Sequence, residues 1–353
     1  MLKWGQISKP LPVLILLIMT GCDPDSGGYS GPYLSSPDDF EPSISLMSDE
    51  PLAPTPILPA GDIRKQMGLN ASASFERAGL DYVGAMLADS GARTLEPLRG
   101  QPLKSIDLTR TPISDLAPLN GMPLESVSLV ECPVQDLSPL ENSPLVSLDL
   151  SKTSLTSLSS VGRFSQLREL YLEEAPIEDL MPLRELPLEK LWLANCPVSQ
   201  LAPLQGKSLA ELNLCGTRID SLRDLQGAAI QSLWLRNTRI SDLTPLAGSR
   251  LVSLDLQGTP VSDLTPLAGM DSLERLNLTE TDVTDLTPLK NLRLVRLIFS
   301  PERITQGIDG IREMKSLQQI DVSFDGMGRA KSSSEFWELY DAGKFNPESR
   351  PTP

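Results

Sequence analysis

The sequence predicts a repeat solenoid with short parallel β-strands on its concave face and turns or 3₁₀ segments on its convex face. Three observations support this fold class. One phrase recurs along most of the chain, its period is only 21–23 residues, and aliphatic residues fill the same places in each copy. A unit of that length cannot bury its apolar face alone, so neighbouring copies must stack into one continuous core.

The recurring phrase is Leu-x-x-Leu-x-Leu-x-x-Thr-x-Ile-x-Asp-Leu-x-Pro-Leu. In a strand, successive side chains point to opposite faces. In the copy that starts at Leu251, Leu254 and Leu256 therefore point inward, whereas Ser253 and Asp255 point outward. The Pro-Leu pair leaves no room for a full convex helix. The first aliphatic position is occupied in successive copies by Leu103, Leu124, Leu145, Leu167, Leu188, Leu209, Ile230, Leu251, Leu273, Leu294 and Leu317.

This phrase resembles the leucine-rich repeat, in particular the short bacterial class of about 22 residues typified by the internalins. The resemblance covers residues 94–324, for which it implies a leucine-rich-repeat solenoid of about 11–12 repeats. The closing residues 349–353 do not resemble a sortase motif, so the internalin style of wall attachment is not expected. Such scaffolds bind unrelated partners, so the resemblance does not name a ligand.

Two polar columns accompany the repeat. The first takes the place of the usual asparagine ladder and holds Thr111, Cys132, Thr153, Ala175, Cys196, Thr217, Thr238, Thr259 and Thr281. The second is a series of convex-turn aspartates, which either cap the backbone N–H groups of their own turns or form a calcium ladder. Because no Gly-rich calcium signature accompanies them, we expect capping. The aspartates are Asp115, Asp136, Asp179, Asp242, Asp263 and Asp285.

Three cysteines lie in the repeats. Cys132 and Cys196 are three repeats apart, about 14 Å by strand spacing, which exceeds the limit of about 7 Å for a disulfide. A bridge between Cys196 and Cys215, one repeat apart, is conceivable but geometrically unfavourable. We expect Cys132 and Cys196 to be small buried residues, and no metal site.

The N-terminus, residues 1–21, has the layout of an export signal. Lys3 and Lys9 precede an apolar run at residues 11–19, which is shorter than the roughly 20 residues that span a bilayer. The run ends in Met19-Thr20-Gly21-Cys22, which resembles the bacterial lipobox. That resemblance implies cleavage before Cys22 and diacylation of its thiol, for example with palmitate. The other interpretation is an ordinary signal peptide with an incidental cysteine.

The segments that flank the repeats differ in character. Residues 22–61 are rich in Pro, Ser, Gly and carboxylates and contain no Lys or Arg, which predicts a disordered acidic tether. Residues 62–93 are predicted to form a helical N-terminal cap, since Phe75, Leu80, Val83 and Met86 recur at helical spacing. Residues 325–353 predict a C-terminal capping helix, N-capped by Ser334, and a disordered tail; docking of a partner is the other interpretation.

Composition restricts the function. The formal net charge is −15, which disfavours nucleic acid and a polybasic attachment to anionic lipid. The chain has no histidine, so the commonest general base and metal ligand are missing. We therefore predict a protein that is not an enzyme, without catalytic residues or a cofactor. Paired carboxylates such as Glu169 and Glu173 are the remaining option for acid–base chemistry.

The central outward position of the strands identifies the candidate binding surface. Aromatic residues cluster there in the fourth to seventh repeats, with Trp192 and Trp234 expected about 10 Å apart on strands two positions apart. Exposed aromatics among charged residues are typical of binding hot spots; alternatively, the rings only cover the sheet and each other. The candidate ligand-binding residues are Tyr171, Trp192, Asn213, Trp234, Glu169, Glu173, Lys190, Glu211 and Arg236.

Together these features predict a scaffold in the bacterial cell envelope, attached to a membrane by a lipid and facing the periplasm or the exterior. Its expected ligand on the concave sheet is a protein or a peptide, with a glycan as the other class considered. The alternative function is a structural component of the envelope that uses the solenoid as a spacer or assembly unit without a specific soluble ligand. An open sheet implies no enclosed pocket.

Overall fold

The computed structural model describes residues 58–322 and 331–345. The predictions for the export signal and Cys22, and most of the predicted tether, concern residues outside these ranges. Within the described part of the chain, no helix is both long and apolar enough to cross a membrane.

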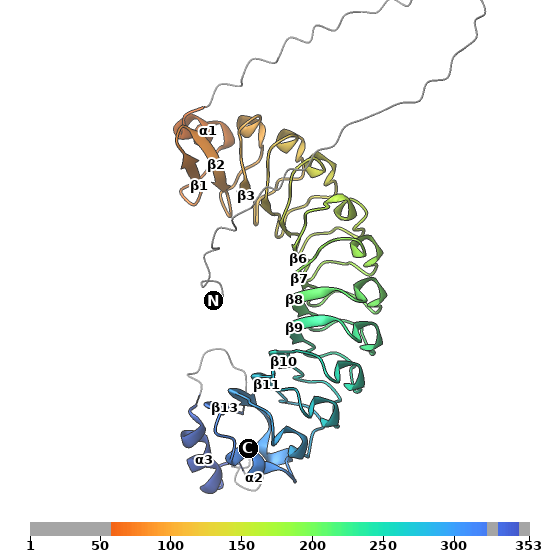
Figure 1. The fold of residues 1–353 in the computed structure, drawn as a ribbon. Helices are drawn as coiled ribbons and strands as arrows, with labels where there is room; N and C mark the ends of the chain where they lie inside the picture. The colour runs from red at the N-terminus through yellow and green to blue at the C-terminus, as the bar shows by residue number, and fades with distance from the viewer. Residues whose placement is uncertain (1–57, 323–330, 346–353) are drawn as a thin grey trace, which may run out of the picture. The chain divides into compact units, whose positions relative to one another are not determined.

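One sheet runs through the described residues, with its strands in sequence order (Figure 1). The hairpin of β1 (Ser74–Ala78) and β2 (Asp81–Met86) is antiparallel, and every later pairing between two of these strands is parallel. Each repeat contributes one short strand because its aliphatic residues alternate over only a few positions. The remaining strands are β3 (Ser105–Asp107), β4 (Ser126–Ser128), β5 (Ser147–Asp149), β6 (Glu169–Tyr171), β7 (Lys190–Trp192), β8 (Ser208–Asn213), β9 (Ala229–Trp234), β10 (Ser253–Asp255), β11 (Arg275–Asn277), β12 (Arg296–Ile298) and β13 (Gln319–Asp321).

The strands line the inner side of the curve in Figure 1, and short 3₁₀ helices lie on its outer side. This confirms the predicted solenoid. In most of the 3₁₀ helices the middle residue is proline, whose fixed φ and missing N–H suit the start of a helical turn. The 3₁₀ helices span Glu96–Leu98, Ala117–Leu119, Ser138–Leu140, Val161–Arg163, Met181–Leu183, Ala202–Leu204, Arg223–Leu225, Thr244–Leu246, Thr265–Leu267, Thr287–Leu289 and Pro301–Arg303.

The core is a continuous column of aliphatic side chains between the strands and the outer turns. Leu251, Leu254 and Leu256 are each at most 1% exposed, as their strand positions predict. Burial of a leucine side chain contributes about 1.5–3 kcal/mol to folding. Each repeat therefore adds its own share of stability and also covers the core of its neighbour.

Both predicted polar columns close turns. In the inner column, the threonine hydroxyls donate to the carbonyl oxygen three residues earlier, as Thr238 does to Leu235 at 2.7 Å. In the outer column, all six aspartates accept a hydrogen bond from the backbone N–H two residues later, for example Asp263 from Thr265 at 2.8 Å. Capping is therefore the observed role of these carboxylates.

The N-terminal cap differs from the prediction in one part. A helix does form, α1 (Ala60–Met67), but Phe75, Leu80, Val83 and Met86 belong to the β1–β2 hairpin, so a helix there was a wrong prediction. Gly79 adopts a φ of 67° at the tip, where glycine carries no Cβ penalty. β2 then pairs in parallel with β3, so the hairpin extends the repeat sheet at its N-terminal edge.

The C-terminal end is covered by helices, as predicted. α2 (Ile308–Arg312) replaces the outer 3₁₀ turn before β13, and α3 (Ser333–Asp341) follows β13. Ser332, and not Ser334 as expected, is the N-cap of α3, since a capping box joins it to Glu335. Phe336 is fully buried and its ring lies 5.6 Å from that of Phe299, which closes the core.

Candidate binding face

The parallel register places one residue of each repeat in a central column of the inner face. Tyr171 of β6 pairs with Trp192 of β7, which pairs with Asn213 of β8, which in turn pairs with Trp234 of β9. Asp149 and Asp255 continue the column on either side. The aromatic residues therefore lie side by side, as the repeat alignment predicts, and Tyr171, Trp192, Asn213 and Trp234 are hereafter called the aromatic patch.

The rings of the patch contact one another directly. The ring centroids of Tyr171 and Trp192 are 5.4 Å apart, and those of Trp192 and Trp234 are 6.1 Å apart, both edge to face. Trp192 and Trp234 are two strands apart, as expected, but their rings lie closer than the strand spacing of about 10 Å, so the indoles approach each other across Asn213. All three aromatic side chains are half-buried, so part of each ring is open to solvent.

A row of charged residues borders the patch on the same face, two residues before the central position of each strand. Lys190 Nζ lies 3.1 Å from Glu169 Oε1 and 4.0 Å from Glu211 Oε1. These two carboxylates also hold the rings, since Tyr171 Oη donates to Glu169 at 3.3 Å and Trp192 Nε1 donates to Glu211 at 3.1 Å. Desolvation alone would lower the pKa of Lys190, but its hydrogen bond to Glu169 and the nearby carboxylates raise it. Lys190 is thereby a fixed cation that orders the polar edge of the patch.

The other candidates, Glu173 and Arg236, lie on the opposite border of the aromatic patch, two residues after its central column. Asn213 Nδ2 donates to Glu173 Oε1 at 3.4 Å, and Asn213 Oδ1 accepts from the backbone N–H of Cys215 at 3.1 Å. Arg236 Nη2 is directed to Asp255 Oδ2 at 2.6 Å. Glu169 and Glu173, the pair considered for acid–base chemistry, are thus both engaged in the polar contacts that frame the patch.

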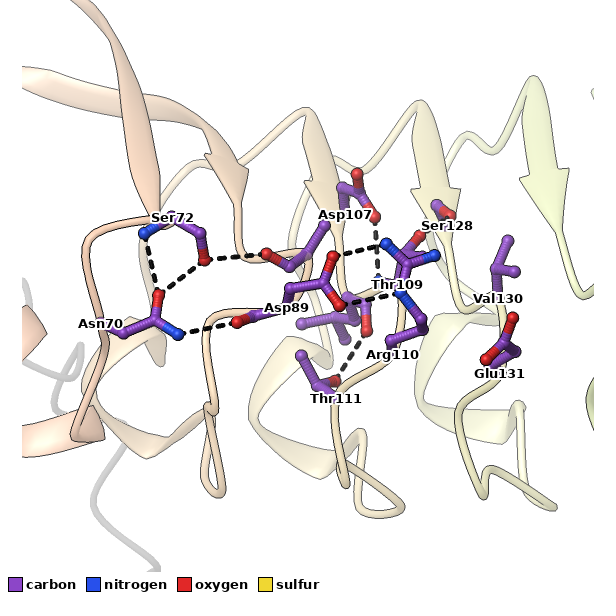
Figure 2. Close-up of polar contacts among 12 residues, drawn as sticks. Asn70, Ser72, Asp89, Asp107, Thr109, Arg110, Thr111, Ser128, Val130 and Glu131 are labelled. Atoms are coloured by element: carbon purple, nitrogen blue, oxygen red, sulfur yellow. Dashed lines mark hydrogen bonds and ion pairs between the residues drawn. The ribbon is translucent and has the colours of Figure 1, made fainter. Parts of the chain in front are cut away.

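Two central aspartates, Asp107 and Asp149, belong to the same face but were not among the candidate residues. Figure 2 shows Asp107, whose Oδ1 accepts from the backbone N–H of Thr109 at 2.9 Å, and Thr109 Oγ1 lies 2.9 Å from Ser128 Oγ. Asp149 accepts in the same way from Ser151 at 2.9 Å. Burial raises the pKa of Asp149, and the charge of Asp107 raises it further. The recurrence of aspartate at this column is the sequence signal that could have identified them.

The three cysteines of the repeats are free thiols in the structure. Cys132 Sγ donates to Leu108 O at 3.0 Å and Cys196 Sγ to Leu172 O at 2.9 Å, so both are buried members of the inner column. Cys215 is half-buried and free. Burial raises the pKa of both Cys196 and Cys215 to about 11. Within the described ranges, no group of three or more His, Cys, Asp or Glu side chains is placed to hold a metal ion.

A hollow of about 440 Å³ lies on the flank of the repeats, beside the column that carries Cys196. Its lining combines small residues with one anionic and one cationic residue. The lining residues are Glu174, Ala175, Pro176, Asn195, Cys196, Pro197, Gly216 and Arg218. None of these residues belongs to the aromatic patch.

The repeat register, the inner polar column and the outer 3₁₀ turns together define the class: the described chain is a leucine-rich-repeat solenoid. No protein-family model and no curated protein sequence matches the chain. Solved structures do match it.

An internalin (InlF) from Listeria monocytogenes is similar over 75% of this chain and 90% of its own, with 19% identity and a TM-score of 0.57. Internalin C2 from the same organism matches 52% of this chain and 83% of its own, with 25% identity and a TM-score of 0.46. A leucine-rich-repeat protein of Leptospira interrogans matches 65% and 74%, with 18% identity and a TM-score of 0.48. The match to InlF supports the expectation of an internalin-like repeat fold.

Proposed function

We propose that this protein is a membrane-anchored, extracytoplasmic binding module that holds a protein or peptide on the aromatic patch. The observation that carries the proposal is the group of half-open rings of Tyr171, Trp192 and Trp234, held by contacts to one another and by Glu169 and Glu211. Large aromatic side chains fixed before binding add contact area with little further loss of side-chain entropy. The proposal concerns binding, and it assigns no catalytic residue and no cofactor.

The anchoring part of the proposal is based on the sequence. Export to the bacterial cell envelope is supported by Lys3, Lys9 and the apolar run that follows them. Acylation of Cys22 is supported by the lipobox-like ending of that run. Stable attachment needs more than one acyl chain, since each buried CH₂ contributes about 0.8 kcal/mol. Metabolic labelling with palmitate should mark the wild-type protein and leave Cys22→Ser unlabelled. A wild-type protein without label would contradict the anchor.

The binding part is tested by selection of random twelve-residue peptides on the immobilised full chain. The wild type should enrich a set of peptides, and Trp192→Ala/Trp234→Ala should lose them while its thermal unfolding stays cooperative. Trp337→Ala is the matched control, because it removes a half-buried indole from α3, away from the patch. Equal enrichment on the double variant and the wild type would show that the patch is not the binding surface. A spacer without a ligand predicts no enrichment on any of the three proteins.

A further inference from the structure

The carboxylates of the inner face differ in their partners from one end of the face to the other. Toward the C-terminal end, Asp255 lies 2.6 Å from Arg236, and Asp321 lies 3.0 Å from Arg296. Each of these aspartates therefore has a guanidinium partner, and each is only 6% exposed. In this part of the face, the two aspartates are therefore already neutralised by the protein's own arginines.

The other end of the face lacks such partners. Within residues 58–322 and 331–345, no Lys or Arg nitrogen lies within ion-pair distance of Asp107, Asp149 or Glu173. Backbone N–H groups serve Asp107 and Asp149, and the neutral amide of Asn213 serves Glu173. In the described part of the chain, none of these three carboxylates of the inner face thus has a cation in ion-pair contact.

These carboxylates are half-buried and affect each other unfavourably. Burial raises the pKa of Asp149, and the charge of Asp107 raises it further. Burial likewise raises the pKa of Glu173, as do the charges of Asp149 and Glu174, against a smaller opposing effect of Lys152. A cation placed among these groups would reduce the repulsion, and contacts between charged partners of opposite sign also favour correct orientation of a ligand.

We propose, on the basis of the proposed function, that the occupant of the inner face is an extended basic polypeptide segment. Its Lys or Arg side chains lie over Asp107, Asp149 and Glu173, and one apolar or aromatic side chain lies against Trp192 and Trp234. This assignment also excludes the chain's own residues 23–57 as the occupant, because they contain carboxylates and no Lys or Arg.

The sheet sets the spacing of such a segment. Asp107 and Asp149 stand two strands apart, on β3 and β5, which corresponds to about 10 Å at a strand separation of about 4.8 Å. Trp192, on β7, lies two further strands along the column. A peptide in the extended polyproline II conformation that runs across the strands advances about 3.1 Å per residue, and its side chains three positions apart point to the same side. Two cationic residues about three positions apart, followed about three positions later by an apolar residue, match these distances.

The test is the same selection of twelve-residue peptides on the full chain, read out as the charge of the enriched set. We expect a positive average charge, with cations spaced as described, and binding that weakens as the salt concentration rises. For an individual enriched peptide, Asp149→Asn/Glu173→Gln should raise the Kd about tenfold, the effect of about 1.4 kcal/mol. The matched control, Asp220→Asn/Asp271→Asn, makes the same change in total charge at exposed positions away from the inner face.

The outcomes separate this inference from the proposed function. Enriched peptides that depend on Trp192 and Trp234 but carry no excess of positive charge would overturn the basic segment and leave the binding function intact. Equal loss of affinity in both pairs of charge variants would also overturn it, because the effect would then come from total charge. No enrichment at all would contradict both proposals.

Discussion

Trp192 and Trp234 lie on strands two positions apart, yet their ring centroids are 6.1 Å apart with an interplanar angle of 61°. The indoles bridge the intervening strand by leaning over Asn213, and Tyr171 extends the contact from the other side of Trp192. The inner face thus presents one connected aromatic surface.

This contact predicts a measurable coupling between the two tryptophans. Edge-to-face aromatic pairs contribute about 0.5–1.5 kcal/mol beyond simple burial. A double-mutant cycle with Trp192→Leu and Trp234→Leu, followed by urea unfolding, should give a coupling free energy in that range. The pair Tyr171→Leu and Trp234→Leu serves as the control, with a smaller expected value, because no direct ring contact is found between these two residues. Additive effects of the two tryptophan substitutions would contradict the contact.

The inner threonine column predicts a stability effect at Thr238. Its hydroxyl is buried and donates to Leu235 O at 2.7 Å, so Thr238→Val should lower the free energy of unfolding by about 1 kcal/mol. Thr156→Val at an exposed position is the control and should change it by less than about 0.5 kcal/mol. Guanidinium unfolding monitored by circular dichroism measures both, and equal effects would exclude a structural role for this hydrogen bond.

The carboxylate of Asp149, which has no ion-pair partner among the described residues, predicts a pH-dependent change in stability. Its pKa is raised in the folded state, so the ionised carboxylate destabilises the fold at neutral pH, and this penalty disappears once both the folded and unfolded forms are protonated. Asp149→Asn should therefore be more stable than the wild type at pH 7, and the difference should vanish below about pH 4. Thermal unfolding across this pH range measures it. An Asn variant that is less stable than the wild type at pH 7 contradicts the argument.

For the capping aspartates, the ionised carboxylate is expected to stabilise the fold, which is the opposite of its effect at Asp149. Hydrogen bonds from the side chain and backbone of Thr265 lower the pKa of Asp263. The stabilisation by its ionised carboxylate is present above the unfolded pKa of about 3.9 and is lost as the pH falls through the folded pKa. Asp263→Ala should thus have a lower urea midpoint than the wild type at pH 7, and the two midpoints should approach each other in acid. A midpoint difference that grows in acid would exclude the cap.

Some parts of the fold could be predicted from the sequence and others could not. The strand register follows directly from Leu251, Leu254, Leu256 and their equivalents, because a slip by one residue would turn every leucine outward. The hairpin at residues 74–86 could not be predicted in this way, since pairing of β2 with the first repeat strand overrides the local helical spacing. The N-cap of α3 was expected two residues too late, because Ser332 and Ser334 are both suitable caps and only Ser332 has glutamate three positions later.

The candidate site divides in the same manner. The central column was predictable, because it depends only on register, but the ring contact depends on how far two side chains lean, which strand spacing does not determine. The charge difference between the two ends of the face was also hidden. It depends on which carboxylate an arginine reaches, and Arg236 reaches Asp255 on the next strand.

Hydroxyl-radical footprinting of the full chain with a selected peptide locates the binding surface most directly, because it reports the solvent access of individual side chains. We expect the oxidation rates of Trp192 and Trp234 to fall severalfold when the peptide is bound, while that of Trp337, an indole on α3, stays the same. Unchanged oxidation of Trp192 and Trp234 in the presence of bound peptide would contradict the aromatic patch as the binding surface.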